Sequence, residues 1–331
     1  MDEKKVLNLY RPDHFGNEII LADGTARAGK SKLHQLLSGF EGVELPSLEL
    51  LPERLSFFYY HNLIDKKAAI ALLKTALQFR LFYNMQARNV NFKPGDYSGV
   101  FGNANWIKYI KRLFLKDSSV AMENLHKERA ILQLMVHDTL GYPNLFFDAY
   151  GDKVYWLEMV CHPIDLINSK YRKKHDLRED SSSSYTLTLK EGENIVPWWH
   201  IYDKDGEYLK LSHMDRVIWS TYHRLKHIME EYNKLSDSQK KQILWIPLEK
   251  MMIDPWTYIA KIEKLIKRKP AKYMKKNLKR YNFPDTMERI LESRKKKEEL
   301  IRSKASPKYI ALMEKMVTEY ETTDWHALNP L

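Results

Sequence analysis

The sequence contains very little cysteine and no long apolar run, and each of these absences excludes a class of protein. Cys161 is the only cysteine among 331 residues, which excludes a disulfide framework and a zinc site built from cysteines. Such cysteine usage fits a reducing cytosol, so we expect a cytoplasmic protein. The chain has no run of about 18 apolar residues, and its first residues contain no apolar core of signal-peptide length. We therefore expect neither a membrane span nor a secretory leader.

Glycine is also scarce, with 12 in the chain, and two of these glycines have an informative spacing. The stretch Gly24–Ser31 reads Gly-x4-Gly-Lys-Ser, the pattern of a phosphate-binding loop. The apolar run Glu18–Ala22 before it suits a buried strand, and leucines after it recur at helical spacing. In that context backbone N–H groups, the lysine charge and the helix dipole all favour an anion. The sequence predicts that Gly24–Ser31 holds a phosphorylated ligand.

Positive charge is in excess and unevenly distributed. The formal net charge is +11 and the pI about 9.3, with much of the excess in Lys264–Arg280 and Arg294–Lys304. Such runs bind polyanions or simply form solvated helix faces, and the sequence leaves both open.

Strand-like and helix-like stretches alternate along the chain. Two further buried strands are expected at Val154–Val160 and Ile243–Leu248. Helices are expected at Leu63–Met85, Trp106–Phe114, Asn124–Val136, Asp215–Tyr232, Trp256–Ile266 and within Asp285–Glu321. This alternation predicts an α/β protein, a three-layer P-loop fold with a central parallel sheet and many helices. We expect a single domain with helical insertions over residues 1–284 and a charged helical extension, residues 285–331, packed on it.

The loop itself resembles that of the sulfotransferases, P-loop enzymes that use 3′-phosphoadenosine 5′-phosphosulfate (PAPS). In that family the 5′-phosphosulfate loop typically reads Pro-Arg-Ser-Gly-Thr-Thr and runs into a leucine-rich helix. Here Lys30 takes the place of a threonine. The resemblance implies that the 5′ end of PAPS contacts Arg27, Ala28, Gly29, Lys30, Ser31 and Lys32.

A second segment, Val160–Asp165 followed by Ser169, resembles the family's 3′-phosphate segment, Val-Arg-His/Asp-Pro-x-Asp with a later serine. Cys161 falls where the family has an arginine. A cysteine cannot supply the bidentate, permanently charged grip of a guanidinium. The resemblance implies that Cys161 and Ser169 border the 3′-phosphate. Either another cation, Arg172 or the Lys267–Lys269 cluster, replaces the arginine, or binding of that phosphate is weak or absent.

A third segment, Trp245–Lys250 with Asp254 and Pro255, resembles a late strand of the family and is a structural landmark. The resemblance implies in-line sulfuryl transfer from PAPS without a metal. Negative charge then grows on the bridging oxygen of the leaving group, where Lys30 and backbone N–H groups would stabilise it and Ser31 would add a hydrogen bond.

The acceptor needs a general base. The resemblance to glycan-type members points to Glu49, with His34 and His61 as alternatives. It implies a hydroxyl or amine of a carbohydrate or related small molecule as acceptor, and no nucleic acid. The aromatic run Trp198–His200 would stack on an acceptor, although packing in the core is its more ordinary use.

Two other functions compete. A P-loop kinase or NTPase would use Mg-ATP, with Ser31 on the metal, but no expected strand ends in an apolar run followed by aspartate. A non-catalytic protein would bind a polyanion through the basic tail. The oligomeric state stays open.

Overall fold

The computed structural model describes residues 9–12, 18–96, 98–103, 105–115, 117–174, 186–325 and 327–328. Most of the polar stretch 173–185, which the sequence suggested as an excursion from the fold, lies outside these residues. Within the described part no helix has the length and apolar character needed to cross a bilayer.

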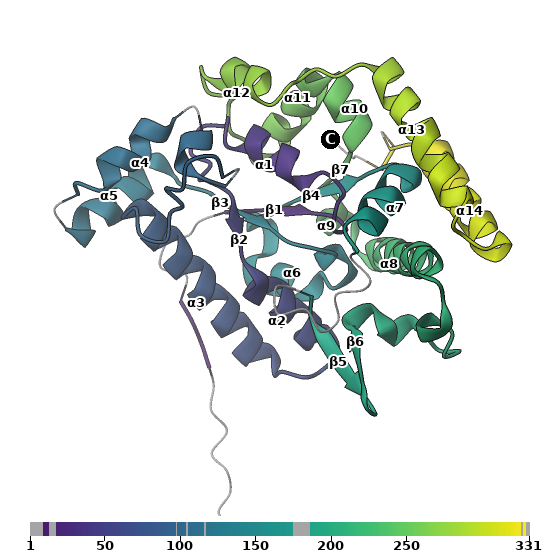
Figure 1. Ribbon diagram of the computed structural model, residues 1–331. Coiled ribbons are helices and arrows are strands. Elements are labelled where there is room, and N and C mark those ends of the chain that lie inside the picture. The colour runs from purple at the N-terminus through teal and green to yellow at the C-terminus, as the bar shows by residue number, and fades with distance from the viewer. Residues whose placement is uncertain are drawn as a thin grey trace, which may run out of the picture.

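A five-stranded parallel sheet forms the centre of the molecule (Figure 1). Its strands are β1 (Ile19–Asp23), β2 (Ser47–Leu48), β3 (Leu132–Met135), β4 (Val154–Val160) and β7 (Ile243–Pro247). Their order across the sheet is β2-β3-β1-β4-β7, which puts β1 between β3 and β4. Every residue of β1, β3, β4 and β7 is buried, as expected when helices cover both faces of a parallel sheet.

Two helical layers enclose this sheet and confirm the three-layer α/β fold predicted from the sequence. Successive residues of β1 point to opposite faces, so Leu21 packs into one core and Ile20 into the other. The first core is covered by α3 (Lys66–Met85), α5 (Ser118–Glu128), α6 (Asn144–Tyr150) and part of α8 (His213–Lys234). The second is covered by α1 (Lys30–Leu37), α10 (Leu248–Ile253), α11 (Pro255–Ile266) and α12 (Met274–Arg280).

The last two helices pack beside the sheet. Helices α13 (Met287–Arg302) and α14 (Pro307–Thr322) lie against α7 (Pro163–Arg172) and α8 (Figure 1). Ile301 and Met313 join the buried side chains of α7 and α8 in a third apolar core. Ion pairs reinforce the contact, because Arg294 and Lys297 of α13 lie 2.9 and 2.6 Å from the carboxylate of Asp165 in α7.

Several elements differ from the sequence-based expectation. The helix expected at Asn124–Val136 is wrong, because α5 stops at Glu128, Arg129 adopts a left-handed conformation with φ of 47°, and the chain continues as β3. An apolar run as short as Leu132–Val136 fits a strand or a buried helix equally well.

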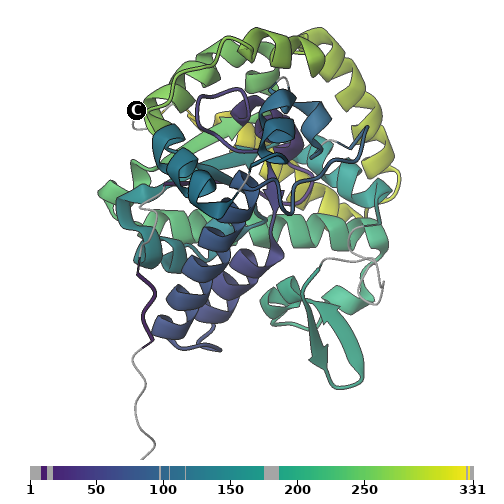
Figure 2. The same cartoon turned by 90° about the vertical axis from the view of Figure 1, so that its left-hand side faces the viewer.

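Other elements were not foreseen. Helix α2 (Leu50–Tyr60) carries Pro52 in its first turn, where proline is tolerated. The hairpin of β5 (Thr188–Glu191) and β6 (Asn194–Pro197) stands apart from the sheet (Figure 2). Of the remaining α-helices described, α4 (Trp106–Arg112) lies where a helix was expected at Trp106–Phe114, and α9 (Asp237–Lys240) was not expected.

Candidate active site

The Gly-x4-Gly-Lys-Ser segment joins β1 to α1 as a tight turn. Gly24 has φ of 128°, and a Cβ atom there would lie 2.4 Å from the carbonyl oxygen of Met159. Gly29 has φ of 96° directly before α1. Both conformations are costly for residues with a side chain. The sequence pattern is therefore a requirement of this backbone, which directs the start of α1 toward the carboxyl edge of the sheet.

Lys30 is buried inside the curve of this loop. Its ammonium donates hydrogen bonds to the carbonyl oxygens of Gly24, at 2.5 Å, and Thr25, at 2.9 Å. Burial lowers the pKa of Lys30, and the nearby carboxylates of Asp23 and Asp138 partly offset this effect. The lysine thus holds the loop and supplies positive charge beside the cavity that it lines.

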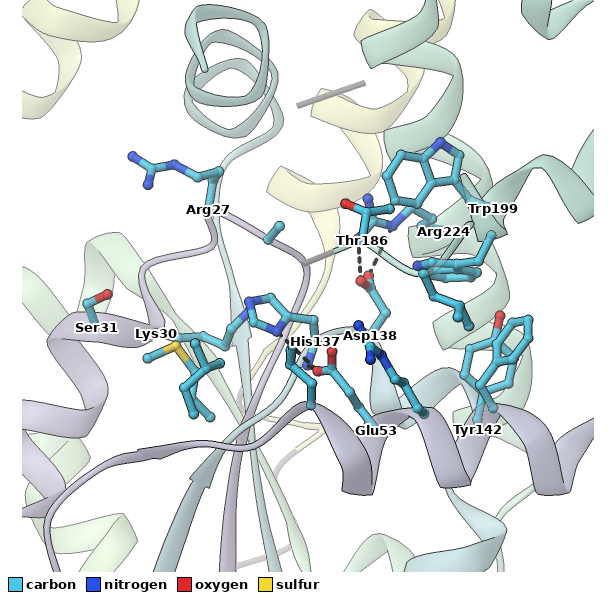
Figure 3. A pocket seen from close by; sticks show the side chains of 18 of the residues that line it. Arg27, Lys30, Ser31, Glu53, His137, Asp138, Tyr142, Thr186, Trp199 and Arg224 are labelled. Carbon is cyan, nitrogen blue, oxygen red and sulfur yellow. Dashed lines mark hydrogen bonds and ion pairs between the residues drawn. The ribbon is translucent and has the colours of Figure 1, made fainter. Parts of the chain in front are cut away.

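A cavity of about 550 Å³ opens in front of the loop. Its walls come from the loop, α2, the end of β3, the 3-10 helix Trp198–Tyr202 and α8 (Figure 3). Of the site residues proposed from the sequence, the lining includes Arg27, Gly29, Lys30, Ser31 and Lys32. Ala28, Glu49, Cys161 and Ser169 are not part of the lining.

Glu53 and His137 form a pair inside the cavity beside Lys30. The Glu53 carboxylate accepts a hydrogen bond from the backbone N–H of His137 at 2.9 Å and lies 3.2 Å from its Nδ1. Burial raises the pKa of Glu53 to about 8. Burial and the charge of Lys30 lower the pKa of His137 to about 3. The imidazole is therefore neutral, and the Glu53 carboxyl exchanges its proton near neutral pH, as a general base requires.

Asp138 follows His137 and is bound to α8. Its carboxylate accepts hydrogen bonds from the guanidinium of Arg224, one of them from Nε at 3.2 Å. Both side chains are buried. The Arg224 guanidinium also lies over the rings of Trp198 and Trp199, 5.4 and 4.5 Å from their centroids. The end of β3 is thereby tied to the aromatic side of the cavity.

The loop and the segment after β4 meet at one hydrogen bond. Arg27 donates from Nε to Ser169 Oγ at 2.9 Å, although 142 positions separate them in the chain. This contact joins the two segments that the resemblance assigned to the two ends of PAPS.

Cys161 directly follows β4 and is buried in the second core. Burial raises the pKa of its thiol well above the usual value. Arg294 and Lys297 of α13 supply positive charge near the thiol. Both side chains form ion pairs with Asp165, and Arg294 also pairs with Glu249. Of the cations expected to replace the family's arginine, Arg172 is exposed, and Arg268 of the 267–269 cluster pairs with Glu18. The basic stretch that begins at Arg294 was the sequence signal for the cations found here.

The base candidates from the sequence lie elsewhere. Glu49 precedes α2 and pairs with Arg80 at 3.2 Å. His34 is buried with its Nδ1 2.7 Å from the amide oxygen of Gln133. The His61 ring contacts the Phe57 ring, with 4.4 Å between centroids and an angle of 50° between the ring planes.

Sequence reasoning missed Glu53 and His137. Two signals pointed to them: Glu53 lies one helical turn after Glu49, and His137 follows the apolar run of β3.

The aromatic run has divided roles. Trp199 is buried, and its indole N–H donates to the hydroxyl of Tyr208 at 3.1 Å. His200 pairs with Glu191 at 2.9 Å. Trp198 is half-buried and lines the cavity together with part of Trp199.

Comparison with known proteins finds similarity only among solved structures. No protein-family model matches the chain, and no curated protein matches it. The sulfotransferase domain of the Synechococcus PCC 7002 olefin synthase is 13% identical over 95% of this chain and 98% of that one, with a TM-score of 0.48. A sulfotransferase from Alicyclobacillus acidocaldarius is 15% identical over 97% and 99%, with a TM-score of 0.39. The sulfotransferase domain of the curacin biosynthetic pathway is 10% identical over 93% and 98%, with a TM-score of 0.44. At such identities an activity has to be argued from the residues of this chain.

Proposed function

We propose that this protein is a sulfotransferase that moves the sulfuryl group of PAPS to a hydroxyl or amine of a small acceptor. The observation that carries the proposal is the hydrogen bond between Arg27 and Ser169. It brings the phosphate loop and the second half of α7, the helix after β4, together, as expected for a ligand with phosphate groups at both ends. The cavity in front of Lys30 leaves room for an acceptor.

The residues of the loop fit such a donor. Gly24 lies so close to β4 that a side chain would not fit there, and its backbone N–H donates to Asp23 Oδ1 at 2.7 Å. Arg27, Lys30, Ser31 and Lys32 supply cationic and hydroxyl donors along the lining. This set of hydrogen-bond donors suits a phosphosulfate anion.

The chemistry follows from where charge develops. PAPS supplies the sulfuryl group and leaves as adenosine 3′,5′-bisphosphate. The S–O bond to the donor phosphate breaks while a new bond forms between sulfur and the acceptor oxygen or nitrogen. Lys30 and the N–H groups at the start of α1 stabilise the negative charge on the departing oxygen. The acceptor proton passes to the Glu53–His137 pair, since these side chains share a hydrogen bond beside Lys30.

One observation favours the kinase or NTPase as a second candidate. The expectation that no strand ends in an apolar run followed by aspartate is wrong, because β3 leads through Val136 and His137 to Asp138 beside the loop. An aspartate there would hold Mg²⁺ with Ser31. Asp138 is instead bonded to Arg224, which argues for metal-free chemistry.

A thermal-shift comparison distinguishes the candidates. Adenosine 3′,5′-bisphosphate should raise the melting temperature more than Mg-ATP does. A ligand at one hundred times its Kd adds about 2.7 kcal/mol to the free energy of unfolding. Arg27→Ala and Ser169→Ala should weaken the bisphosphate effect, whereas Arg302→Ala, at the other end of α13 and paired with Glu298 and Glu314, should not.

Other outcomes of the thermal-shift comparison would favour the alternative functions. Stabilisation by Mg-ATP alone would establish the kinase reading. Stabilisation by heparin with no response to either nucleotide would favour the non-catalytic polyanion-binding protein. A carbohydrate acceptor, which the sequence favoured, stays a prediction for acceptor assays.

A further inference from the structure

The cavity has two chemically different ends (Figure 3). Arg27, Lys30 and Ser31 lie at one end, and Tyr142 and Trp199 at the other, with Glu53, His137 and Asp138 between them. The proposed donor occupies the cationic end, because phosphate and sulfate are anions. The aromatic end is therefore the place where the acceptor body lies.

Three rings form most of this end, which we call the aromatic wall: Phe57, Tyr142 and Trp198. The ring centroids lie 5.3 Å apart for Phe57 and Tyr142, and 5.7 Å apart for Trp198 with each of the other two. Each pair meets edge to face, a packing that fixes the rings against one another. Leu50 and Leu187 add aliphatic surface to the lining of the cavity.

The polar side chains of this end already interact with other groups of the protein. The hydroxyl of Tyr142 shares a hydrogen bond of 2.8 Å with that of Tyr202, and the indole N–H of Trp199 is bound to Tyr208. The remaining polar side chains on this side, Arg54, Thr186 and Arg224, also interact with other protein groups.

This arrangement bears on which acceptor fits. A carbohydrate body carries several hydroxyls, and each loses hydrogen bonds to water when it is buried against carbon. An apolar body loses none and gains from contact with the wall.

We infer that the acceptor carries a single reactive hydroxyl on a flat, apolar body, an aromatic or alicyclic alcohol, which packs against the aromatic wall. This inference rests on the proposed sulfuryl transfer. In that step the acceptor O–H bond breaks, its proton goes to the Glu53–His137 pair, and the acceptor oxygen forms its bond to the sulfur of PAPS. The bridging S–O bond of the donor breaks, and the bisphosphate keeps its electron pair.

Binding of two probes in the presence of adenosine 3′,5′-bisphosphate tests the inference by calorimetry. We expect 2-naphthol to bind at least about tenfold more tightly than methyl glucoside, a ratio that a few apolar contacts supply. Trp198→Ala should weaken 2-naphthol binding at least about tenfold and leave bisphosphate binding unchanged. Trp256→Ala is the matched control, because Trp256 lies in α11 outside the cavity lining and is 46% exposed. Should Trp198→Ala fail to fold, Trp198→Leu removes the ring and keeps an apolar side chain.

The outcomes separate the two claims. Equal or tighter binding of methyl glucoside, or unchanged 2-naphthol binding in the Trp198 variant, would overturn the inference while bisphosphate binding keeps the proposed function. Absence of bisphosphate binding and of sulfate transfer from PAPS to either probe would overturn the proposed function itself. The inference is supported when 2-naphthol is preferred and the Trp198 variant loses that preference.

Discussion

Replacement of Glu53 by glutamine is the sharpest perturbation of the proposed mechanism. Glutamine keeps the size of the side chain and an oxygen that accepts the backbone N–H of His137, but it cannot take a proton. General-base catalysis contributes on the order of 10²–10⁴ in rate. We expect Glu53→Gln to lower kcat for sulfuryl transfer by about that factor and to leave the Kd for adenosine 3′,5′-bisphosphate unchanged.

The raised pKa of Glu53 adds a pH signature. The base acts in its deprotonated form, and burial raises the pKa of Glu53 to about 8. The wild-type rate of transfer should therefore rise with pH up to about 8 and then level off. The Glu53→Gln variant should lose this rise, which a pH–rate profile between pH 6 and about 9 would measure.

The same substitution should stabilise the fold at alkaline pH. The folded protein keeps the Glu53 proton between pH 4.5 and about 8, whereas the unfolded chain has lost it. Wild-type stability therefore falls as pH rises through this window, by at most about 5 kcal/mol. Denaturant unfolding at pH 6 and at about pH 8.5 should show that the free energy of unfolding of Glu53→Gln increases relative to that of the wild type as the pH rises.

Glu49 provides a matched comparison one helical turn away. Its carboxylate pairs with Arg80 outside the cavity lining, so Glu49→Gln should transfer sulfate at nearly the wild-type rate. The reasoning is refuted if Glu53→Gln retains full activity, or if Glu49→Gln loses as much activity as Glu53→Gln. The second result would restore the base that the sequence suggested.

Two further substitutions test the loop and the buried charges. Lys30→Ala should reduce turnover by about 10²–10³, and Lys30→Arg should not restore it. Lys30 is buried against loop carbonyls and Asp23, so Lys30→Ala should also lower the free energy of unfolding in urea by roughly 3 kcal/mol. Full transfer activity in this variant would remove Lys30 from the mechanism. Burial alone would raise the pKa of Glu44, but Lys108 and Arg112 lower it to about 2. The lowered pKa contributes about 3 kcal/mol to the free energy of unfolding. This stabilisation is present above pH 4.5 and is lost as the pH falls through 2. Glu44→Gln should therefore unfold more easily at pH 7 and flatten the acid limb, and an unchanged acid limb would contradict this.

The stability expected for Lys30→Ala differs from what the sequence alone suggests. A phosphate-loop lysine is expected to face its ligand, so its loss should affect turnover far more than folding. Here the ammonium lies within the curve of the loop, above buried Asp23 and Glu158. Sequence identifies the lysine, but its burial depends on side chains from neighbouring strands.

Elements with strong local signals were predicted well from the sequence. The strand expected at Val154–Val160 is β4 to the residue, and the expected helix Trp256–Ile266 begins one residue earlier, at Pro255. Both have long apolar patterns and clear boundaries. Strand β2 has only two residues, Ser47–Leu48, and no sequence pattern of that length is informative. The strand β3 is short and follows a helix directly, so its apolar residues extend the helical pattern.

The pairing of Glu53 with His137, the proposed general base, could not be predicted from the sequence for a related reason. Glu53 belongs to α2 and His137 to the turn after β3, and 84 positions separate them. Their meeting depends on β3 pairing with β1, which the sequence did not reveal. The Gly-x4-Gly-Lys-Ser turn is local and its sequence signal is clear, whereas the groups around it come from several distant segments and were not predicted.

The identity of the nucleotide depends on the same strand. A Gly-x4-Gly-Lys-Ser loop binds phosphate, and its residues alone do not distinguish Mg-ATP from PAPS. The residue at the end of β3 makes the distinction, because a free carboxylate there would hold a metal ion with Ser31. In this protein Asp138 is bonded to Arg224, and the Arg224 guanidinium lies over Trp198 and Trp199. Replacing such a partner with Mg²⁺ would leave a buried guanidinium without its counter-charge, a cost of several kcal/mol. The same buried pair thus holds the aromatic side of the cavity in place, where the proposed acceptor would lie.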